Sequence, residues 1–177
     1  KKLGNPNPKF TLGWSNNIFF KNFSIDFLFD GRFGGEVMSM TSAALDLAGA
    51  SKATGDARDV GGEKINAVHE DGGKVTSIDP KIFYTSVGGR AGIGEYYMYD
   101  ATNIRLRELS LGYRVPVASK WVKSFTVSLI GRNLFFITKR APFDPETSMS
   151  TYNSLQGIDT FGNPVTRSLG ASVKLGF

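Results

Sequence analysis

The last ten residues of the chain, SLGASVKLGF, alternate strictly between apolar residues and small or polar ones. A period of two gives a strand one apolar face and one polar face. Ten residues is also about the length that a tilted strand needs to cross a bilayer. The pattern therefore predicts a strand of a transmembrane β-barrel, although strands of soluble β-sandwiches alternate in the same way. The apolar set is Leu169, Ala171, Val173, Leu175 and Phe177.

The composition limits the other classes of fold. The 177 residues include 21 Gly, 14 Phe and 6 Tyr but no Cys, so a disulfide scaffold and a thiolate metal site are excluded. The mean hydropathy is −0.15 and no apolar stretch reaches the length of a transmembrane helix. The net charge of +5 comes from Lys and Arg residues that are scattered among acidic ones. Nucleic-acid binding needs a basic patch or a recognisable module, so we expect no nucleic-acid partner.

Four further segments have the same period of two, at residues 9–20, 23–30, 103–115 and 122–136. A tight turn at Lys21 joins the first two segments, which predicts a hairpin. Another short turn, near Ser119, joins the third and the fourth. The second segment is the clearest case, with Phe23, Ile25, Phe27 and Phe29 on one face and Ser24, Asp26, Leu28 and Asp30 on the other. The sequence thus predicts an all-β fold with about five antiparallel strands.

Short and long connections alternate between these strands. About seventy residues separate the second strand from the third, far more than an ordinary loop needs. Outer-membrane barrels have short periplasmic turns and long extracellular loops. We therefore expect residues 35–100 and 138–165 to form two extracellular loops, and the turns at Lys21 and Ser119 to be periplasmic. Within the first loop, residues 39–48 predict a short helix that stops at Gly49, and residues 71–73 predict a hairpin turn.

The third strand contains a conflict. Its apolar face, continued backwards from Leu109, reaches Arg107 and Arg105, which are unsuited to lipid. One solution places Arg107 near the outer interface, where a long basic side chain can extend towards water. The other is a β-bulge near Glu108, after which Ile104 and Leu106 continue the apolar face. The sequence leaves both solutions open.

Candidate functional residues lie on the polar faces and at the strand ends. Polar groups inside large barrels set selectivity, so substrate or a plug could contact the lumen-facing candidates. The favoured explanation is that these residues only hydrate the lumen or pair with residues of the plug. Trp14, Phe19 and Phe20 are candidates for the aromatic girdles that flank the apolar band. We expect the lumen-facing candidates to be Asp26, Asp30, Glu108 and Arg114, and the periplasmic girdle to be Tyr113, Trp121 and Phe177.

No catalytic or metal site is predicted. The segment Asp144-Pro145-Glu146 could contact a cation or a sugar hydroxyl, but Asp before Pro is typical of a turn. His69 is the single histidine, and it lacks the other ligands of a metal site. No nucleophile with a base and no paired carboxylates are evident, so we predict neither an enzyme nor a cofactor.

Several segments together resemble the C-terminal part of the SusC/RagA family of TonB-dependent transporters of the Bacteroidetes outer membrane. The combination of RLRELSLGYRVP and GRNL is the most specific. The terminal strand also resembles the last strand of outer-membrane proteins, in which Val173, Leu175 and Phe177 would be the signal for barrel assembly. The matching segments are PKFTLGW, KNFSIDFLFDGRFGG, ARD at 57–59, YDATNIRLRELSLGYRVP at 99–116, GRNLFFIT at 131–138 and FDPE at 143–146.

The resemblance implies a multi-pass barrel of 22 strands in the outer membrane, of which residues 1–177 supply the C-terminal part. It implies import of large nutrients, oligosaccharides or peptides, with energy from TonB, an N-terminal plug and a SusD-like surface lipoprotein as partner. Since even the smallest barrels have about eight strands, we expect this chain to pair with further strands of a larger protein and to contact lipid. The alternative is a soluble, secreted carbohydrate-binding module, in which Phe23, Ile25, Phe27 and Phe29 would pack inside a core.

Overall fold

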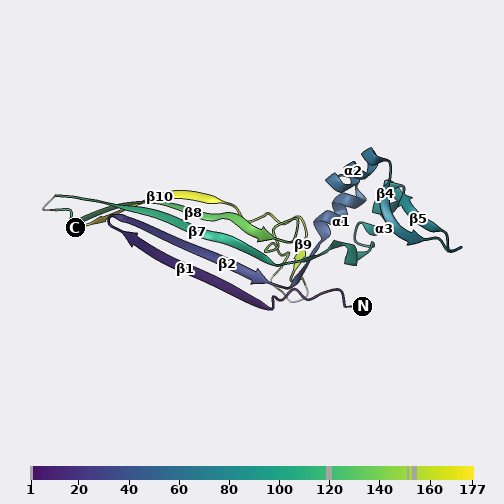
Figure 1. Cartoon of the computed structure of the whole chain (residues 1–177), viewed down its shortest axis with the longest axis horizontal. Coiled ribbons are helices and arrows are strands. Elements are labelled where there is room, and N and C mark those ends of the chain that lie inside the picture. The colour runs from purple at the N-terminus through teal and green to yellow at the C-terminus, as the bar shows by residue number, and fades with distance from the viewer. Residues whose placement is uncertain (1, 119–120, 151, 153–154) are drawn as a thin grey trace. The chain divides into compact units, whose positions relative to one another are not determined.

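The computed structural model describes residues 2–118, 121–150, 152 and 155–177. They form two compact units. The first, which we call the wall unit, comprises Asn7–Gly35, Asp100–Glu146 and Asn163–Phe177. The second, which we call the loop unit, comprises Glu36–Tyr99, Thr147–Gly162 and the residues before Asn7. Figure 1 shows the long strands of the wall unit and the helices of the loop unit.

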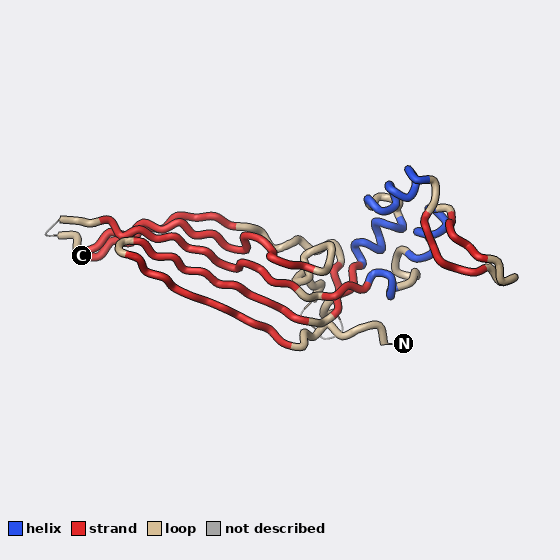
Figure 2. The backbone as a smooth tube through the Cα atoms, in the orientation of Figure 1, coloured by secondary structure: helices blue, strands red, loops and turns tan. Residues whose placement is uncertain are grey.

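The wall unit is an antiparallel sheet of five strands, which lie side by side in Figure 2. Their order is β1-β2-β7-β8-β10, so each strand lies beside the next one of the set along the chain. All five lie where the alternation of the sequence predicts them; the turn near Ser119 falls outside the described residues. The strands are β1 (Phe10–Phe20), β2 (Phe23–Phe33), β7 (Asn103–Val115), β8 (Ser124–Lys139) and β10 (Ser168–Gly176).

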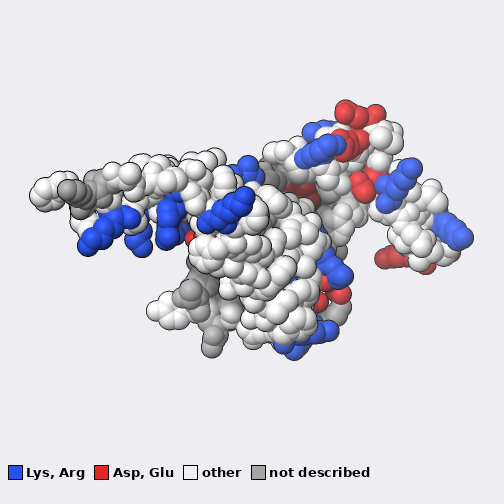
Figure 3. Space-filling model, turned by 60° about the vertical axis from the view of Figure 1, so that its left-hand side comes forward, with Lys and Arg blue, Asp and Glu red and all other residues white. Residues whose placement is uncertain are grey.

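The register sorts the side chains into an apolar face and a polar face. One row of paired positions crosses all five strands on the apolar face, and its large side chains are exposed. The view of Figure 3 contains a broad area without Lys, Arg, Asp or Glu. A neighbouring row on the polar face consists of Phe19, Ser24, Gly112, Ser128 and Ser172. The apolar row consists of Ile18, Ile25, Leu111, Leu129 and Ala171.

A β-bulge at Arg107 settles the conflict in the third strand. Leu106 pairs with Phe29 and Glu108 pairs with Leu28, which leaves Arg107 as the extra residue. A bulge of this kind shifts the alternation by one position. Ile104 and Leu106 therefore continue the apolar face, and the alternative that places Arg107 at a lipid interface is wrong.

The loop unit contains the predicted helix and the predicted hairpin. Helix α1 (Met40–Leu47) begins after Ser39, whose hydroxyl accepts a hydrogen bond from the Ser42 amide, as N-cap residues do. Gly49 follows the helix with a positive φ of 67°, which favours glycine. Strands β4 (Glu63–Val68) and β5 (Lys74–Ile78) form the hairpin around the predicted turn. A small sheet combines β6 (Met98–Asp100), β3 (Glu36–Ser39) and β9 (Ile158–Asp159).

Two more α-helices, which the sequence analysis did not predict, follow α1 in the first loop. Helix α2 (Lys52–Val60) is capped by the Ser51 hydroxyl and ends at Gly61, which has a positive φ of 82°. Helix α3 (Pro80–Val87) is capped by the Asp79 carboxylate. A 3₁₀ helix, η1 (Gly94–Tyr97), precedes β6. No helix in the described ranges has the length and apolarity needed to span a membrane.

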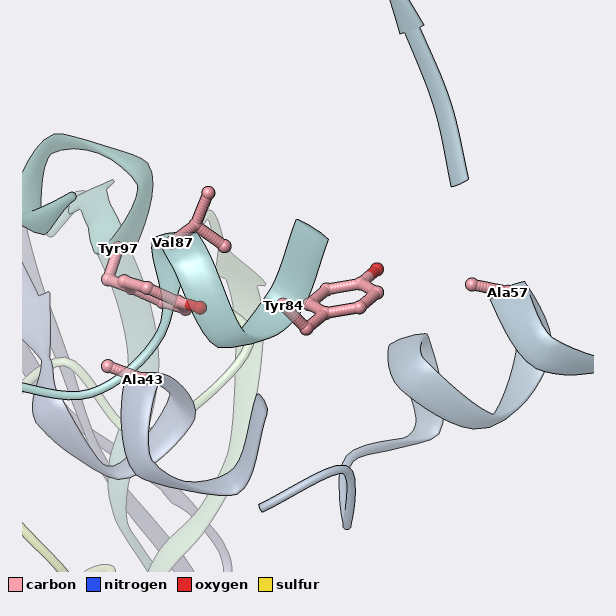
Figure 4. Close-up of a cluster of buried hydrophobic side chains, with 5 residues drawn as sticks. All are labelled: Ala43, Ala57, Tyr84, Val87 and Tyr97. Carbon is pink, nitrogen blue, oxygen red and sulfur yellow. The ribbon is translucent and has the colours of Figure 1, made fainter. Parts of the chain in front are cut away.

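The core of the loop unit is small and joins all three α-helices. Figure 4 shows Tyr84 extending from α3 towards Ala57 of α2, with Tyr97 and Ala43 near the other end of α3. The Tyr97 hydroxyl donates a hydrogen bond of 2.9 Å to a carboxylate oxygen of Asp46 in α1, and the Tyr84 hydroxyl donates one of 2.9 Å to Glu63. Burial, reinforced by these carboxylates, raises the pKa of both tyrosines well above its usual range.

Candidate functional site

Charged side chains from three segments meet on the polar face of the wall unit. We call this group the arginine cluster. Arg107 and Arg105 come from β7, and Asp30 comes from β2. Asp144 and Glu146 come from the segment that follows β8. Three carboxylates therefore surround two guanidinium groups.

Arg107 lies between two of these carboxylates. Its Nη1 and Nη2 atoms donate to the two carboxylate oxygens of Glu146 at 3.1 and 2.7 Å, which is the bidentate geometry of a strong ion pair. Its Nε atom donates to Asp30 at 3.1 Å. Its Nη1 atom also donates to the side-chain oxygen of Asn133 at 3.2 Å. The bulge directs Arg107 towards these partners, since without it the alternation would place this residue on the apolar face.

Arg105 is more deeply buried, with 3% of its side chain exposed. Its Nη2 atom donates to Asp144 at 2.8 Å, and its Nη1 atom lies 3.3 Å from Glu146. The guanidinium group also stacks over the ring of Phe136, 4.0 Å from the ring centre. Removing one partner from a buried pair of this kind costs about 3 to 5 kcal/mol, because the other charge remains buried without compensation.

The segment Asp144-Pro145-Glu146 forms a turn, as its sequence favours. The Glu146 amide donates to the Asp144 carboxylate at 3.1 Å, and the Val165 amide donates to the other Asp144 oxygen at 3.3 Å. The carboxylates of this segment are therefore engaged by arginines and backbone amides. The arginine cluster therefore positions residues 144–146 by binding their carboxylates against the strands.

The predicted lumen-facing residues all lie on the polar face by register, but only Asp30 belongs to the arginine cluster. Glu108 accepts a hydrogen bond of 3.1 Å from Arg132, and both side chains are largely exposed. Asp26 lines a shallow depression together with Glu108. Arg114 is exposed near the end of β7. That this face lines a lumen stays a prediction.

The predicted girdle residues lie at one end of the sheet. Tyr113 pairs with Phe23 next to the β1-β2 turn, and their ring centres are 4.7 Å apart. Trp121 precedes β8 and Phe177 follows β10 at this same end, and both are highly exposed. Their periplasmic side stays a prediction.

The other girdle candidates and the assembly residues can be placed by register too. Val173 and Leu175 lie on the apolar face, where they pair with Val127 and Phe125 of β8. Their role in barrel assembly stays a prediction. Among the remaining aromatic candidates, Phe20 lies on the apolar face near the β1-β2 turn and Trp14 lies on it further along β1. Phe19 is opposite Ser24 on the polar face, because neighbouring residues of a strand point to opposite sides.

Sequence reasoning missed most of the arginine cluster. In the sequence, Arg105 and Arg107 indicate only a conflict with the apolar face of the third strand. Asp144 and Glu146 indicate only a turn. The signal was present in the motif segments RLRE, GRNL and FDPE, which contribute Arg105, Arg107, Asn133, Asp144 and Glu146. Nothing in the sequence indicated that these segments meet in space.

Comparison with known proteins extends over nearly the whole chain. No protein-family model matches it. TonB-dependent receptor P3 of Formosa agariphila is 27% identical over 98% of this chain, and TonB-dependent receptor P26 of the same organism is 27% identical over 97%. The chain spans 17% of the length of each of these relatives. The resemblance drawn from the sequence motifs is thereby confirmed.

Solved structures share the fold. A chain of the RagAB peptide transporter superposes with a TM-score of 0.67 and 21% identity. The match covers 97% of this chain and 17% of the RagAB chain. A chain of the RagAB peptide importer in its open-open state gives a TM-score of 0.64 with the same coverage. The arrangement of strands and connections described above is therefore found in proteins of very different sequence.

Proposed function

We propose that this chain, as a segment of a TonB-dependent receptor, supplies wall strands and loops of an outer-membrane barrel that imports large nutrients. One observation carries the proposal: a row of exposed apolar side chains crosses all five strands, opposite a polar face. A barrel wall in lipid needs this division, because its outside contacts hydrocarbon and its inside contacts water. The relatives named as TonB-dependent receptors support the same assignment.

In this proposal the sheet continues into further strands at both sides. β1 and β10 are its edge strands, and hydrocarbon cannot hydrate their free backbone groups. Strands from the rest of the protein would pair with them to close the proposed barrel of 22 strands. The polar face then lines the lumen with Asp26, Glu108 and the arginine cluster.

Residues 35–100 and 138–165 would be the extracellular loops. They would meet substrate beneath a SusD-like lipoprotein, and TonB would drive displacement of the plug. The RagAB neighbours are described as a peptide importer, and the SusC-like motifs point to oligosaccharides, so the proposed cargo is one of these two classes. No step in the proposal requires catalysis by this chain.

The alternative of a soluble carbohydrate-binding module needs a second layer over the apolar face. Phe23 and Ile25 are instead 57% and 38% exposed. Carbonate washing of membranes tests the choice: the parent protein should stay with the membrane pellet, and its recovery in the supernatant would remove the barrel proposal.

Uptake tests the transport itself. Cells that lack the parent gene should lose uptake of either a fluorescent oligosaccharide mixture or a fluorescent peptide mixture, and a protonophore should abolish the same uptake in the wild type. Normal uptake of both mixtures by the deletion strain would contradict the proposed import function.

A further inference from the structure

A pocket of about 290 Å³ lies among the three α-helices of the loop unit. The last turn of α1 forms one wall, and the facing sides of α2 and α3 form the others. Its volume is at the lower end of the range for small-molecule sites. Its carbon-rich lining includes Leu47, Pro80 and Tyr84, and its charged lining consists of Asp46, Arg58 and Lys81.

Asp46 is the unusual residue of this pocket. Only 6% of it is exposed, and its side-chain hydrogen bond within the described ranges comes from the Tyr97 hydroxyl, which occupies one carboxylate oxygen. It also lies in the last turn of α1, where the helix dipole disfavours a negative charge. A buried carboxylate with one partner is costly, so packing alone does not explain why an acid stands here.

Two cationic side chains line the same pocket and are exposed to solvent. Arg58 uses its Nη1 atom to donate to the Gly49 carbonyl at 3.1 Å, which anchors the side chain and leaves further N–H donors free for a ligand. Lys81, in the first turn of α3, adds a second positive charge. With Asp46 as the single acid in the lining, the pocket carries a net charge of +1.

We propose that this pocket binds a small organic acid that also carries a hydroxyl or amide hydrogen-bond donor. Asp46 accepts from the donor, while Arg58 and Lys81 pair with the ligand carboxylate and balance the charge. The carbon skeleton of the ligand contacts Leu47 and Tyr84. A sugar acid and the C-terminal residue of a peptide share this chemistry.

The site does not depend on the proposed transport, because binding is measured on the purified parent protein. Calorimetric titration in detergent should use D-galacturonate for the sugar-acid source and N-acetyl-L-alanine for the peptide-end source. D-galactose and N-acetyl-L-alaninamide are their neutral counterparts. We expect at least one acid to bind about tenfold or more tightly than its counterpart, as a charge-assisted hydrogen bond implies.

The probe that binds identifies the source: galacturonate alone indicates a sugar acid, N-acetylalanine alone indicates a peptide end, and both indicate the shared chemistry. Failure of both acids to bind, or equal binding of the neutral counterparts, would overturn the proposal.

Three variants locate the binding. Asp46→Asn keeps an oxygen that can accept from the Tyr97 hydroxyl but removes the charge, and Arg58→Gln removes a cation at an exposed position that does not endanger folding. Each should weaken binding about tenfold or more. Lys52→Gln is the matched control, because Lys52 lies on the same helix, is exposed and is absent from the pocket lining. Wild-type affinity in Arg58→Gln would overturn the assignment even if Asp46→Asn failed to fold.

Discussion

The arginine cluster predicts a local and measurable loss of stability. Arg107→Gln removes the bidentate pair with Glu146 and the bond to Asp30, and leaves these carboxylates facing one another. Complete burial would set the cost at about 3 to 5 kcal/mol. Because the Arg107 and Asp30 side chains are 28% and 37% exposed, solvent screening reduces the expected cost to about 2 to 4 kcal/mol.

Hydrogen exchange of the full-length parent protein measures this cost where it arises. The Glu146 and Val165 amides donate to Asp144, so both report on the turn that the cluster holds. A loss of 2 to 4 kcal/mol corresponds to exchange that is about 30- to 1,000-fold faster. Peptides from the apolar row should keep their wild-type exchange, because the sheet itself does not depend on the cluster.

Arg132→Gln is the matched control. Arg132 pairs with Glu108 on the same face, but the two side chains are 63% and 40% exposed. Exposed pairs contribute less than about 1 kcal/mol, so exchange of the turn should change less than about fivefold. If Arg107→Gln accelerated exchange no more than this control, the cluster would not hold residues 144–146 and the reasoning would be wrong.

Two further predictions concern the loop unit. Gly88→Ala places a Cβ atom 2.6 Å from the Tyr84 carbonyl oxygen and 2.8 Å from the Leu47 amide nitrogen, so it should lower the unfolding free energy of this unit by about 1 to 3 kcal/mol. In Gly55→Ala, the new Cβ atom in α2 meets nothing within 4 Å, so this substitution should raise the same unfolding free energy by about 1 kcal/mol. Hydrogen exchange measures both changes, and equal effects of the two substitutions on stability would refute the argument. The raised pKa of Tyr97 means that its contribution to stability is present below the unfolded-state pKa of about 10 and is lost as the pH rises above it. Absorbance titration should show that Tyr84 and Tyr97 both ionise late, and Tyr97→Phe should remove one of these late-ionising groups. A late-ionising fraction that is unchanged in this variant would contradict the burial of Tyr97.

The sequence predicted the strands of the wall unit well, because each strand has one face of apolar residues and the period of two survives in the sequence. A bulge near Glu108 was one of two solutions that the sequence left open, and the sequence could not choose between them. The bulge adds one residue to β7, and only pairing with β2 and β8 reveals which residue is the extra one. The arginine cluster depends on that bulge, and it joins Asp30 to Glu146 across more than a hundred residues. Local patterns contain no information about such a contact.

The loop unit shows a different failure. The capping residues of α2 and α3 were visible as Ser51, Gly61 and Asp79. The two helices are only 9 and 8 residues long, so their apolar periodicity is too short to stand out. Their position depends on Tyr84 and Tyr97, which pack between elements distant in sequence. The pocket at Asp46 follows from this packing and could not be predicted.

The central claim is that the apolar face of the sheet contacts lipid. Leu111 and Ser110 are neighbours in β7 that point to opposite faces, and the chain contains no native Cys. Leu111→Cys and Ser110→Cys, each labelled with an environment-sensitive fluorophore in the membrane-embedded parent protein, test the claim most directly. Spin-labelled lipid should quench the fluorophore at position 111 strongly and that at position 110 weakly. Equal quenching at both positions, or stronger quenching at position 110, would contradict the account.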